Sequence, residues 1–244
     1  MICIKKLIPF MVVAIVSILL IIISENGNNA ETASSDASLI TVIIDAGHGG
    51  VDGGAVAADG TEEKHINLDI ALRMNNYLTS QGYKTILTRD GDYSIHNEDA
   101  DTIRKKKVSD LNNRLKIING TDNAIFVSVH QNYFNESQYY GTQVFYSPNN
   151  SLSSFLADNI QRSVVESLQP DNTRKIKQSG KDIYLLYNAQ IPSVLVECGF
   201  LSNSAETEKL KDEKYRQQLS ESICKGIINY LNSYDESSSA VVRE

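Results

Sequence analysis

The segment Leu39-Ile40-Thr41-Val42-Ile43-Ile44-Asp45-Ala46-Gly47-His48-Gly49-Gly50 joins an apolar run to a glycine-rich turn. The run from Leu39 to Ile44 has the length and the β-branched content of a buried strand. A strand that ends in Gly, His and Gly presents an imidazole at its carboxyl end, which is where open α/β sheets bind ligands. A phosphate cradle is disfavoured, because the stretch lacks both the ending of a P-loop and the spacing of a dinucleotide fingerprint.

Strand and helix patterns alternate along the rest of the chain. We predict further strands at residues 83–88, 124–129, 142–146, 182–187 and 193–196, and helices at 63–81, 110–119, 151–168 and 212–232. Residues 90–107 are polar and aperiodic, which is typical of a surface insertion. Because helices separate the strands, the predicted class is α/β, a three-layer domain whose mostly parallel central sheet is flanked by helices.

The amino-terminal residues are not expected to belong to this domain. Lys5-Lys6 precede an apolar segment, residues 7–23, that is longer than a usual signal-peptide core and just short of a clear spanning helix. The basic flank predicts that everything after the segment lies outside the membrane. We therefore expect a signal peptide or membrane anchor at 1–23, a polar linker at 24–38, one folded domain at 39–232 and a disordered tail at 233–244.

Composition narrows the possible partners. The chain has 23 Lys and Arg against 30 Asp and Glu, a formal net charge of −7, which argues against nucleic acid because phosphate binding needs a concentrated basic face. The basic cluster Arg104-Lys105-Lys106-Lys107 is short and is interpreted as a solvated loop. Only Cys198 and Cys224 follow the apolar segment, so no disulfide framework is expected. An exported enzyme with few cysteines and no nucleotide cofactor suits hydrolysis in a bacterial cell envelope.

Four side chains occupy comparable places in the predicted fold. His48, His130 and Glu197 stand at strand ends and Glu63 at a helix start. Two imidazoles and one carboxylate form the ligand set of a catalytic zinc site, which leaves a fourth position for water. Zinc lowers the pKa of that water to about 7, and a second carboxylate can pass its proton to a leaving amine. The set therefore suits cleavage of an amide.

Each of these residues could also have a purely structural role. A buried Glu197 without a cation would be costly, however, and one shared site explains all four residues. Spacing alone leaves two choices open: Glu62 could replace Glu63, and Asp45 could orient His48 through a hydrogen bond.

Four separated motifs carry a resemblance to a known family: Asp45-Ala46-Gly47-His48-Gly49-Gly50-Val51-Asp52-Gly53-Gly54-Ala55, Glu63-Lys64, Ser128-Val129-His130-Gln131-Asn132 and Leu195-Val196-Glu197-Cys198-Gly199-Phe200-Leu201-Ser202-Asn203. In this order they resemble the zinc-dependent N-acetylmuramoyl-L-alanine amidases of the amidase-3 family. The resemblance covers residues 39–232, which would form the catalytic domain. By that resemblance His48, Glu63 and His130 correspond to the Zn²⁺ ligands and Glu197 to the catalytic glutamate. It favours Glu63 over Glu62 because the family's ligand precedes a lysine.

The resemblance implies a metal-dependent hydrolase that cuts peptidoglycan between N-acetylmuramic acid and the L-alanine of the stem peptide. Attack of zinc-bound water on the amide carbonyl is the implied chemistry. Gln131 stands where the family usually has a small residue, so we expect it to narrow the mouth of the site. The single export segment, the single domain and Asn172-Thr173-Arg174-Lys175 resemble the germination-specific sporulation amidases of endospore-forming bacteria. Those enzymes strip stem peptides from spore cortex during muramic-δ-lactam formation.

Three alternatives remain from the sequence: a vegetative secreted wall amidase, a zinc peptidase acting within stem peptides, and a non-catalytic wall-binding module. The last is disfavoured because a binder needs no proton shuttle. We expect an exported protein, secreted or anchored in the membrane through its amino-terminal segment, and located in the forespore or cortex space if it is specific to sporulation. Because no wall-gripping domain is evident, an accessory envelope protein is a further expected partner beside peptidoglycan.

Overall fold

The structure is a computed structural model that describes residues 40–241, with side chains described as far as Ser233. The expected signal peptide or anchor and the polar linker lie outside these residues. Among the helices between residues 40 and 241, none has both the length and the apolar character that crossing a bilayer requires.

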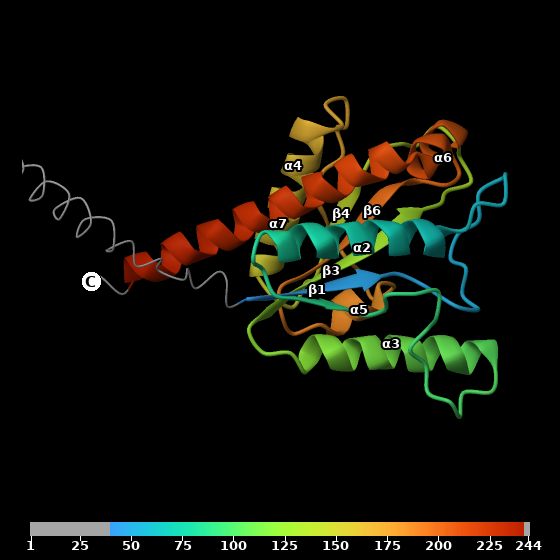
Figure 1. The fold of residues 1–244 in the computed structure, drawn as a ribbon, viewed down its shortest axis with the longest axis horizontal. Coiled ribbons are helices and arrows are strands. Elements are labelled where there is room, and N and C mark those ends of the chain that lie inside the picture. Colours follow the sequence, from blue (N-terminus) through green and yellow to red (C-terminus); the bar gives the residue numbers. More distant parts are fainter. Residues whose placement is uncertain (1–39, 242–244) are drawn as a thin grey trace, which may run out of the picture. The chain divides into compact units, whose positions relative to one another are not determined.

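A six-stranded sheet forms the middle layer of the domain (Figure 1). Its strands are β1 (Thr41–Ala46), β2 (Thr85–Leu87), β3 (Ala124–Asn132), β4 (Gln143–Tyr146), β5 (Lys177–Gln178) and β6 (Ser193–Phe200), in the spatial order β2-β1-β3-β6-β4-β5. The first four in that order are parallel, and β4 runs antiparallel to β6. The predicted α/β class with a mostly parallel sheet is confirmed.

Helices cover both faces of the sheet (Figure 1). One face carries α2 (Glu63–Ser80), α4 (Leu152–Ser167) and α7 (Glu213–Val241), the other carries α3 (Ile103–Asn119) and α5 (Tyr184–Asn188), and α6 (Ser204–Lys211) precedes α7. Alternate residues of β1 supply the two cores. Val42 and Ile44 pack on the α2 side and Ile43 on the α3 side, as the two-residue period of a strand requires.

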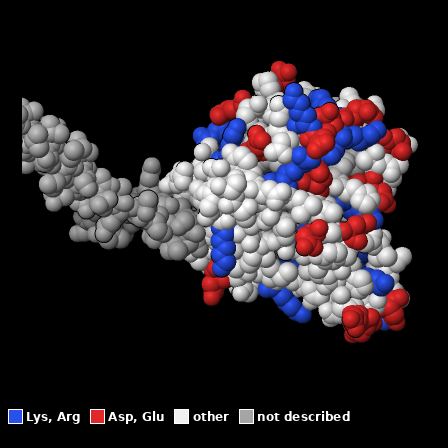
Figure 2. Space-filling view, viewed as in Figure 1, with Lys and Arg blue, Asp and Glu red and all other residues white. Residues whose placement is uncertain are grey.

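Charged side chains of both signs are interspersed on the face that carries α2, α6 and α7 (Figure 2). Two ion pairs on this face join the two long helices: Arg73 of α2 donates to Glu213 of α7 at 3.0 Å, and Arg216 of α7 donates to Asp69 of α2. The expectation that nucleic acid is not a partner stays a prediction.

Two predicted elements differ from the structure. The strand predicted at 182–187 is wrong, because residues 184–188 form α5. Leu185 and Leu186 pack into the same core, whereas consecutive residues of a strand point to opposite faces. The surface insertion predicted up to residue 107 is also too long. Thr102 caps α3 by accepting a hydrogen bond from the Lys105 backbone at 3.2 Å, so the basic cluster opens a helix.

The last helix extends further than the sequence predicts. We expected a disordered tail from residue 233, but α7 continues to Val241. The short elements β5 and α6 were not predicted. Asn203 caps α6 by accepting from the Ala205 backbone at 2.9 Å, a signal that is visible in the sequence.

The order of the strands creates a crevice at the carboxyl ends of β1 and β3. The chain passes from β1 to β2 on one side and returns to β3 on the other, which is the topological switch point where such sheets bind ligands. In the register between β3 and β6, His130 lies opposite Glu197. The fold thus brings the turn after β1, His130 and Glu197 to one edge of the sheet.

Two buried arginines hold the turn that follows β1. Arg89 donates to the carbonyl oxygens of Ala46 at 2.8 Å and Gly47 at 2.9 Å. Arg114 donates to the carbonyl oxygens of Ala46 and His48, each at 2.8 Å. Since buried carbonyls need donors, these contacts fix the backbone path of the turn.

Arg114 is neutralised by two carboxylates, Asp110 at 2.7 Å and Asp45. Burial raises the pKa of Asp45, but Arg114 and the hydroxyls of Ser128 and Thr88 outweigh it and lower the pKa to about 2. A carboxyl whose pKa falls on folding stabilises the folded state when ionised. This stabilisation is therefore present above the ordinary pKa of 3.8 and is lost as the pH falls through about 2.

Replacing Arg114 by Met should lower the free energy of unfolding by about 3–5 kcal/mol, because it leaves buried carboxylates without their cation. Urea denaturation measures the change. Arg162→Met is the matched control, since Arg162 pairs with Asp158 at 3.5 Å on the exposed side of α4. That change should cost less than about 1 kcal/mol. Equal losses in the two variants would contradict the role assigned to Arg114.

Candidate metal centre and active site

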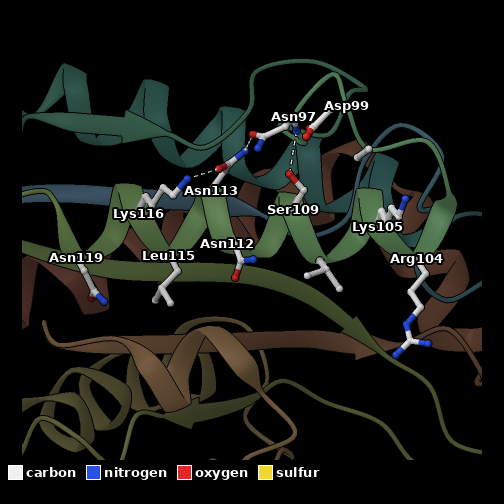
Figure 3. A pocket seen from close by; sticks show the side chains of 12 residues that line it. Asn97, Asp99, Arg104, Lys105, Ser109, Asn112, Asn113, Leu115, Lys116 and Asn119 are labelled. Carbon is white, nitrogen blue, oxygen red and sulfur yellow. Dashed lines mark hydrogen bonds between the residues drawn. The ribbon is translucent and has the colours of Figure 1, made fainter.

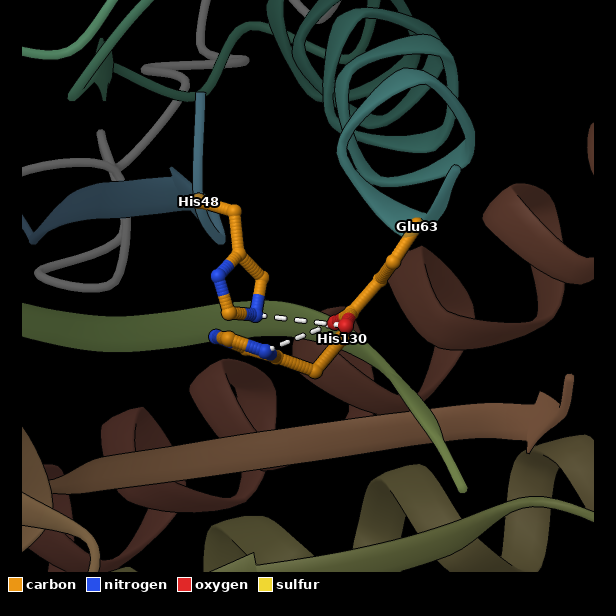
Figure 4. A group of neighbouring side chains, drawn as sticks. All are labelled: His48, Glu63 and His130. Atoms are coloured by element: carbon orange, nitrogen blue, oxygen red, sulfur yellow. Dashed lines mark hydrogen bonds and ion pairs between the residues drawn. The ribbon is translucent and has the colours of Figure 1, made fainter. Parts of the chain in front are cut away.

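His48, Glu63 and His130 meet at the carboxyl edge of the sheet (Figure 4). They come from the turn after β1, the first turn of α2 and β3. Glu63 Oε2 lies 3.2 Å from His48 Nε2, and Glu63 Oε1 lies 2.9 Å from His130 Nδ1. One ligand atom from each residue lies within 4.8 Å of the other two. The structure therefore brings together the three residues that the resemblance indicated as ligands.

His48 is held in an uncommon conformation. Its φ of 62° lies in the left-handed region, which non-glycine residues rarely adopt and which is characteristic of functional sites. Its Nδ1 lies 2.9 Å from Asp52 Oδ2, and the other Asp52 oxygen is 2.7 Å from Lys107 Nζ. A proton on Nδ1 that is donated to Asp52 leaves Nε2 directed at Glu63.

Asp52, and not Asp45, is the carboxylate that orients the ring of His48. The carboxylate of Asp45 instead accepts from Arg114, Ser128 and Thr88 on the far side of the turn. Asp52 was missed because it lies among the glycines after His48, where an acidic residue is also typical of an ordinary turn.

Glu63 is almost completely buried, with 3% of its surface exposed. Five donors surround its two oxygens: the rings of His48 and His130, the backbone N–H groups of Ala55 and Gln131, and the Asn67 amide. Burial raises the pKa of Glu63, but the two histidines outweigh it and hold the pKa far below its usual range. Glu62 points elsewhere and pairs with Lys64 and His65.

These residues fit a divalent cation. Two ring nitrogens and an ionised carboxylate are donors that zinc prefers. Both ring nitrogens of His48 face a carboxylate. Burial lowers the pKa of His48, but the bonds to Asp52 and Glu63 outweigh it and raise the pKa to about 9. A proton is thus favoured where a cation would bind, as expected when metals and protons compete for the same nitrogen.

Glu197 lies beside this group and differs from it electrostatically. Its Oε2 is buried and has no hydrogen-bond partner among the described residues. Burial, partly opposed by His130 and His48 and reinforced by Glu63, raises the pKa of Glu197 to about 7. A carboxyl group with this pKa can accept and release a proton near neutral pH. The structure thus separates one carboxylate that stays ionised from one that can exchange a proton.

Small residues and amides pack closely around the site. A Cβ atom on Gly47 would lie 2.3 Å from Nε2 of His130, so only glycine fits there.

Gln131 does not narrow the mouth of the site, contrary to expectation. It is buried, and its side chain donates to Asn67 Oδ1 at 3.1 Å behind the carboxylate of Glu63.

Two cavities adjoin α3. The larger, of about 820 Å³, runs along the helix (Figure 3), and neither His48 nor His130 lines it. Two asparagines of its lining already donate hydrogen bonds to the protein backbone: the Asn113 amide donates to the Ile95 carbonyl at 2.7 Å, and the Asn119 amide donates to the Asn188 carbonyl at 3.1 Å. The smaller, of about 150 Å³, is lined by both His48 and His130. The chemistry therefore belongs to the smaller cavity.

A family-wide sequence profile of N-acetylmuramoyl-L-alanine amidases, the amidase-3 family, matches residues 42–229. The chain belongs to this family. The amidase is 34% identical over 194 residues to the germination-specific N-acetylmuramoyl-L-alanine amidase of Bacillus subtilis, an alignment that spans 78% of this chain and 79% of the relative.

Solved structures agree with this membership. The amidase resembles the CwlD amidase of Clostridioides difficile, solved in complex with the GerS lipoprotein, with a TM-score of 0.77 and 43% identity over 80% of this chain and 99% of that one. An N-acetylmuramoyl-L-alanine amidase of Clostridium difficile 630 matches with a TM-score of 0.69 and 30% identity over 80% of this chain and 97% of that one. The protein is a peptidoglycan-cleaving N-acetylmuramoyl-L-alanine amidase, and the alternative of a non-catalytic wall-binding module is wrong.

Gly47→Ala should lower kcat/KM of the amidase by about 100-fold, because a displacement of about 1 Å of His130 suffices for such a loss. Release of stem peptides from purified peptidoglycan measures it, and circular dichroism checks that the fold persists. Gly60→Ala is the control for backbone strain alone, because its φ of 88° disfavours alanine while a Cβ atom there meets no atom within 4 Å. That variant should lose stability and keep its activity. Wild-type activity in Gly47→Ala would show that activity does not depend on the close packing of Gly47 against the His130 ring.

Proposed function

We propose that the chain is a zinc-dependent amidase of spore cortex, with His48, Glu63 and His130 as the zinc ligands and Glu197 as the general base. The observation that carries the assignment is a convergent His-Glu-His group beside Glu197, whose Oε2 is buried and has no hydrogen-bond partner within the described part of the chain. The bond cleaved is the amide between N-acetylmuramic acid and L-alanine, the linkage named by the family.

The ligands are arranged so that a cation needs little rearrangement of the protein. Glu63 is already ionised and fixed by backbone N–H groups, and Asp52 keeps the His48 ring turned toward it. A zinc ion held there supplies a Lewis acid that polarises the amide carbonyl and lowers the pKa of water. Lys107 neutralises the Asp52 carboxylate and so limits the negative charge behind the histidine.

Glu197 carries the proton in this proposal. As a carboxylate it accepts a proton from the attacking water, and as a carboxylic acid it donates that proton to the departing amine of L-alanine. A pKa of about 7 makes both forms accessible near neutral pH. The opposition of His130 and Glu197 in neighbouring strands holds the proton carrier next to the proposed ligands.

Glu197→Gln should retain zinc and lose about 10²- to 10⁴-fold in activity, the usual contribution of general acid–base catalysis. Mass spectrometry of digested peptidoglycan measures activity, and elemental analysis measures zinc. The wild type should release whole stem peptides from muramic acid, stop after chelation and recover with zinc. Glu62→Gln, a surface carboxylate beside the site, is the control with normal activity. Shortened stem peptides would instead indicate a zinc peptidase, and a fully active Glu197→Gln would remove Glu197 from the mechanism.

The cortex assignment is supported by the named role of the Bacillus subtilis relative in germination. Peptidoglycan lies outside the cytoplasmic membrane, and the apolar segment at residues 7–23 after Lys5-Lys6 suits export with an extracytoplasmic catalytic domain. We infer that the domain works on the outer side of a membrane, secreted or anchored through this segment.

An accessory envelope protein is part of the same proposal. Its support is the Clostridioides difficile relative, which was solved in complex with the GerS lipoprotein. A lipoprotein partner would hold the catalytic domain at an envelope surface.

Spores of a strain that lacks this chain should contain cortex without muramic-δ-lactam. Muropeptide analysis of isolated cortex measures the lactam, with reintroduced wild type and Glu197→Gln as the matched pair. Only the wild type should restore it. Normal lactam in the deletion strain, together with altered turnover of the vegetative wall, would favour the vegetative wall amidase.

A further inference from the structure

The cavity beside the histidines has a basic wall. Its volume is about 150 Å³, and α3 contributes Lys106, Lys107, Asp110 and Arg114 to its lining. Lys106 and Lys107 belong to the basic cluster Arg104-Lys105-Lys106-Lys107, for which the sequence predicts a solvated loop. Because α3 begins at Ile103, this cluster forms the start of a helix that borders the reaction site.

The three lysines of the cluster have different surroundings. Lys105 is 63% exposed, pairs with Asp101 at 2.8 Å and lines the larger cavity, whose lining does not include the histidines. Lys107 pairs with Asp52 at 2.7 Å and so supports His48. Lys106 is half-buried and lines the reaction cavity, and the structure gives its ammonium group no hydrogen bond or ion pair with any residue between 40 and 233.

The carboxylates near Lys106 are already engaged. Asp45 and Asp110 both bind Arg114, and Asp110 also accepts from the Ile95 backbone at 2.7 Å. Asp52 is shared between His48 and Lys107. Partial burial of an unpaired ammonium group costs free energy, so an anionic group that enters this cavity gains a partner without displacing one.

The substrate carries its negative charge on one side of the scissile bond. The lactyl carboxyl of N-acetylmuramic acid is the acyl group of that amide, so the sugar side is neutral there. Free carboxylates lie on the peptide side, and the nearest belongs to the residue after L-alanine when that residue is an isoglutamate. A cation that recognises substrate beside the histidines therefore recognises the stem peptide.

We propose that Lys106 binds the free carboxylate of the residue that follows L-alanine and thereby determines which stem peptides the enzyme accepts. The inference rests on the proposed reaction centre at His48, Glu63 and His130. It also fixes the direction in which the substrate lies, with the stem peptide along the amino-terminal half of α3. A lysine suits this task because its compact charge on a flexible stem adapts to a single carboxylate.

The test compares two synthetic substrates that differ by one group, N-acetylmuramoyl-L-alanyl-isoglutamate and its isoglutamine counterpart. The wild type should prefer the carboxylate compound about tenfold in kcat/KM, mainly through a lower KM, as expected for one charge-assisted contact. Lys106→Met should abolish the preference and Lys106→Arg should restore most of it. Lys105→Met, a change in the neighbouring residue that lines the larger cavity, should keep the wild-type preference.

Equal cleavage of the two compounds by the wild type would overturn the inference, as would an unchanged preference in Lys106→Met. A loss in kcat alone, of the same size for both compounds, would show that Lys106 supports the structure of the site and does not read the peptide. Failure of the zinc-loaded wild type to cleave either compound would count against the proposed reaction centre, and the inference would fall with it.

Discussion

The turn after β1 depends on two guanidinium groups. Its backbone reverses direction through glycines and through His48, whose φ is positive. The carbonyl oxygens of Ala46, Gly47 and His48 therefore need hydrogen-bond donors from within the protein. Arg89 and Arg114 supply the missing donors, and the carboxylates around Arg114 compensate its charge. Only with this backbone fixed does the ring of His48 face Glu63, so the geometry of the site rests on residues that never touch its centre.

The same arrangement explains how much of the site was accessible from sequence. Each of the four proposed site residues stands at the end or the start of an apolar segment, so its position and residue type together indicate it as a site residue. These residues are His48, Glu63, His130 and Glu197. The orienting residue of His48 was not accessible in this way. Asp45 and Asp52 are both near in sequence, and the choice between them depends on Arg114, which is distant in the chain.

The sequence pattern does not predict the short helix α5 or the start of α3. The residues of α5 form an apolar pair that either a strand or a single helical turn could bury, and the choice was made by the core beneath α3. The start of α3 lacked an apolar periodicity because its residues border a cavity and solvent instead of the core. Where tertiary partners replace periodicity, local pattern does not determine the element.

The position of β6 has a consequence for the timing of activity. Among the strands between residues 40 and 241 it is synthesised last, yet it lies in the interior of the sheet, between β3 and β4. A chain that has emerged only as far as residue 192 therefore has a sheet divided into two parts, and it lacks Glu197. Such a chain cannot bring Glu197 beside His130. The group of four residues is therefore complete only after β6 has been synthesised and has joined the sheet.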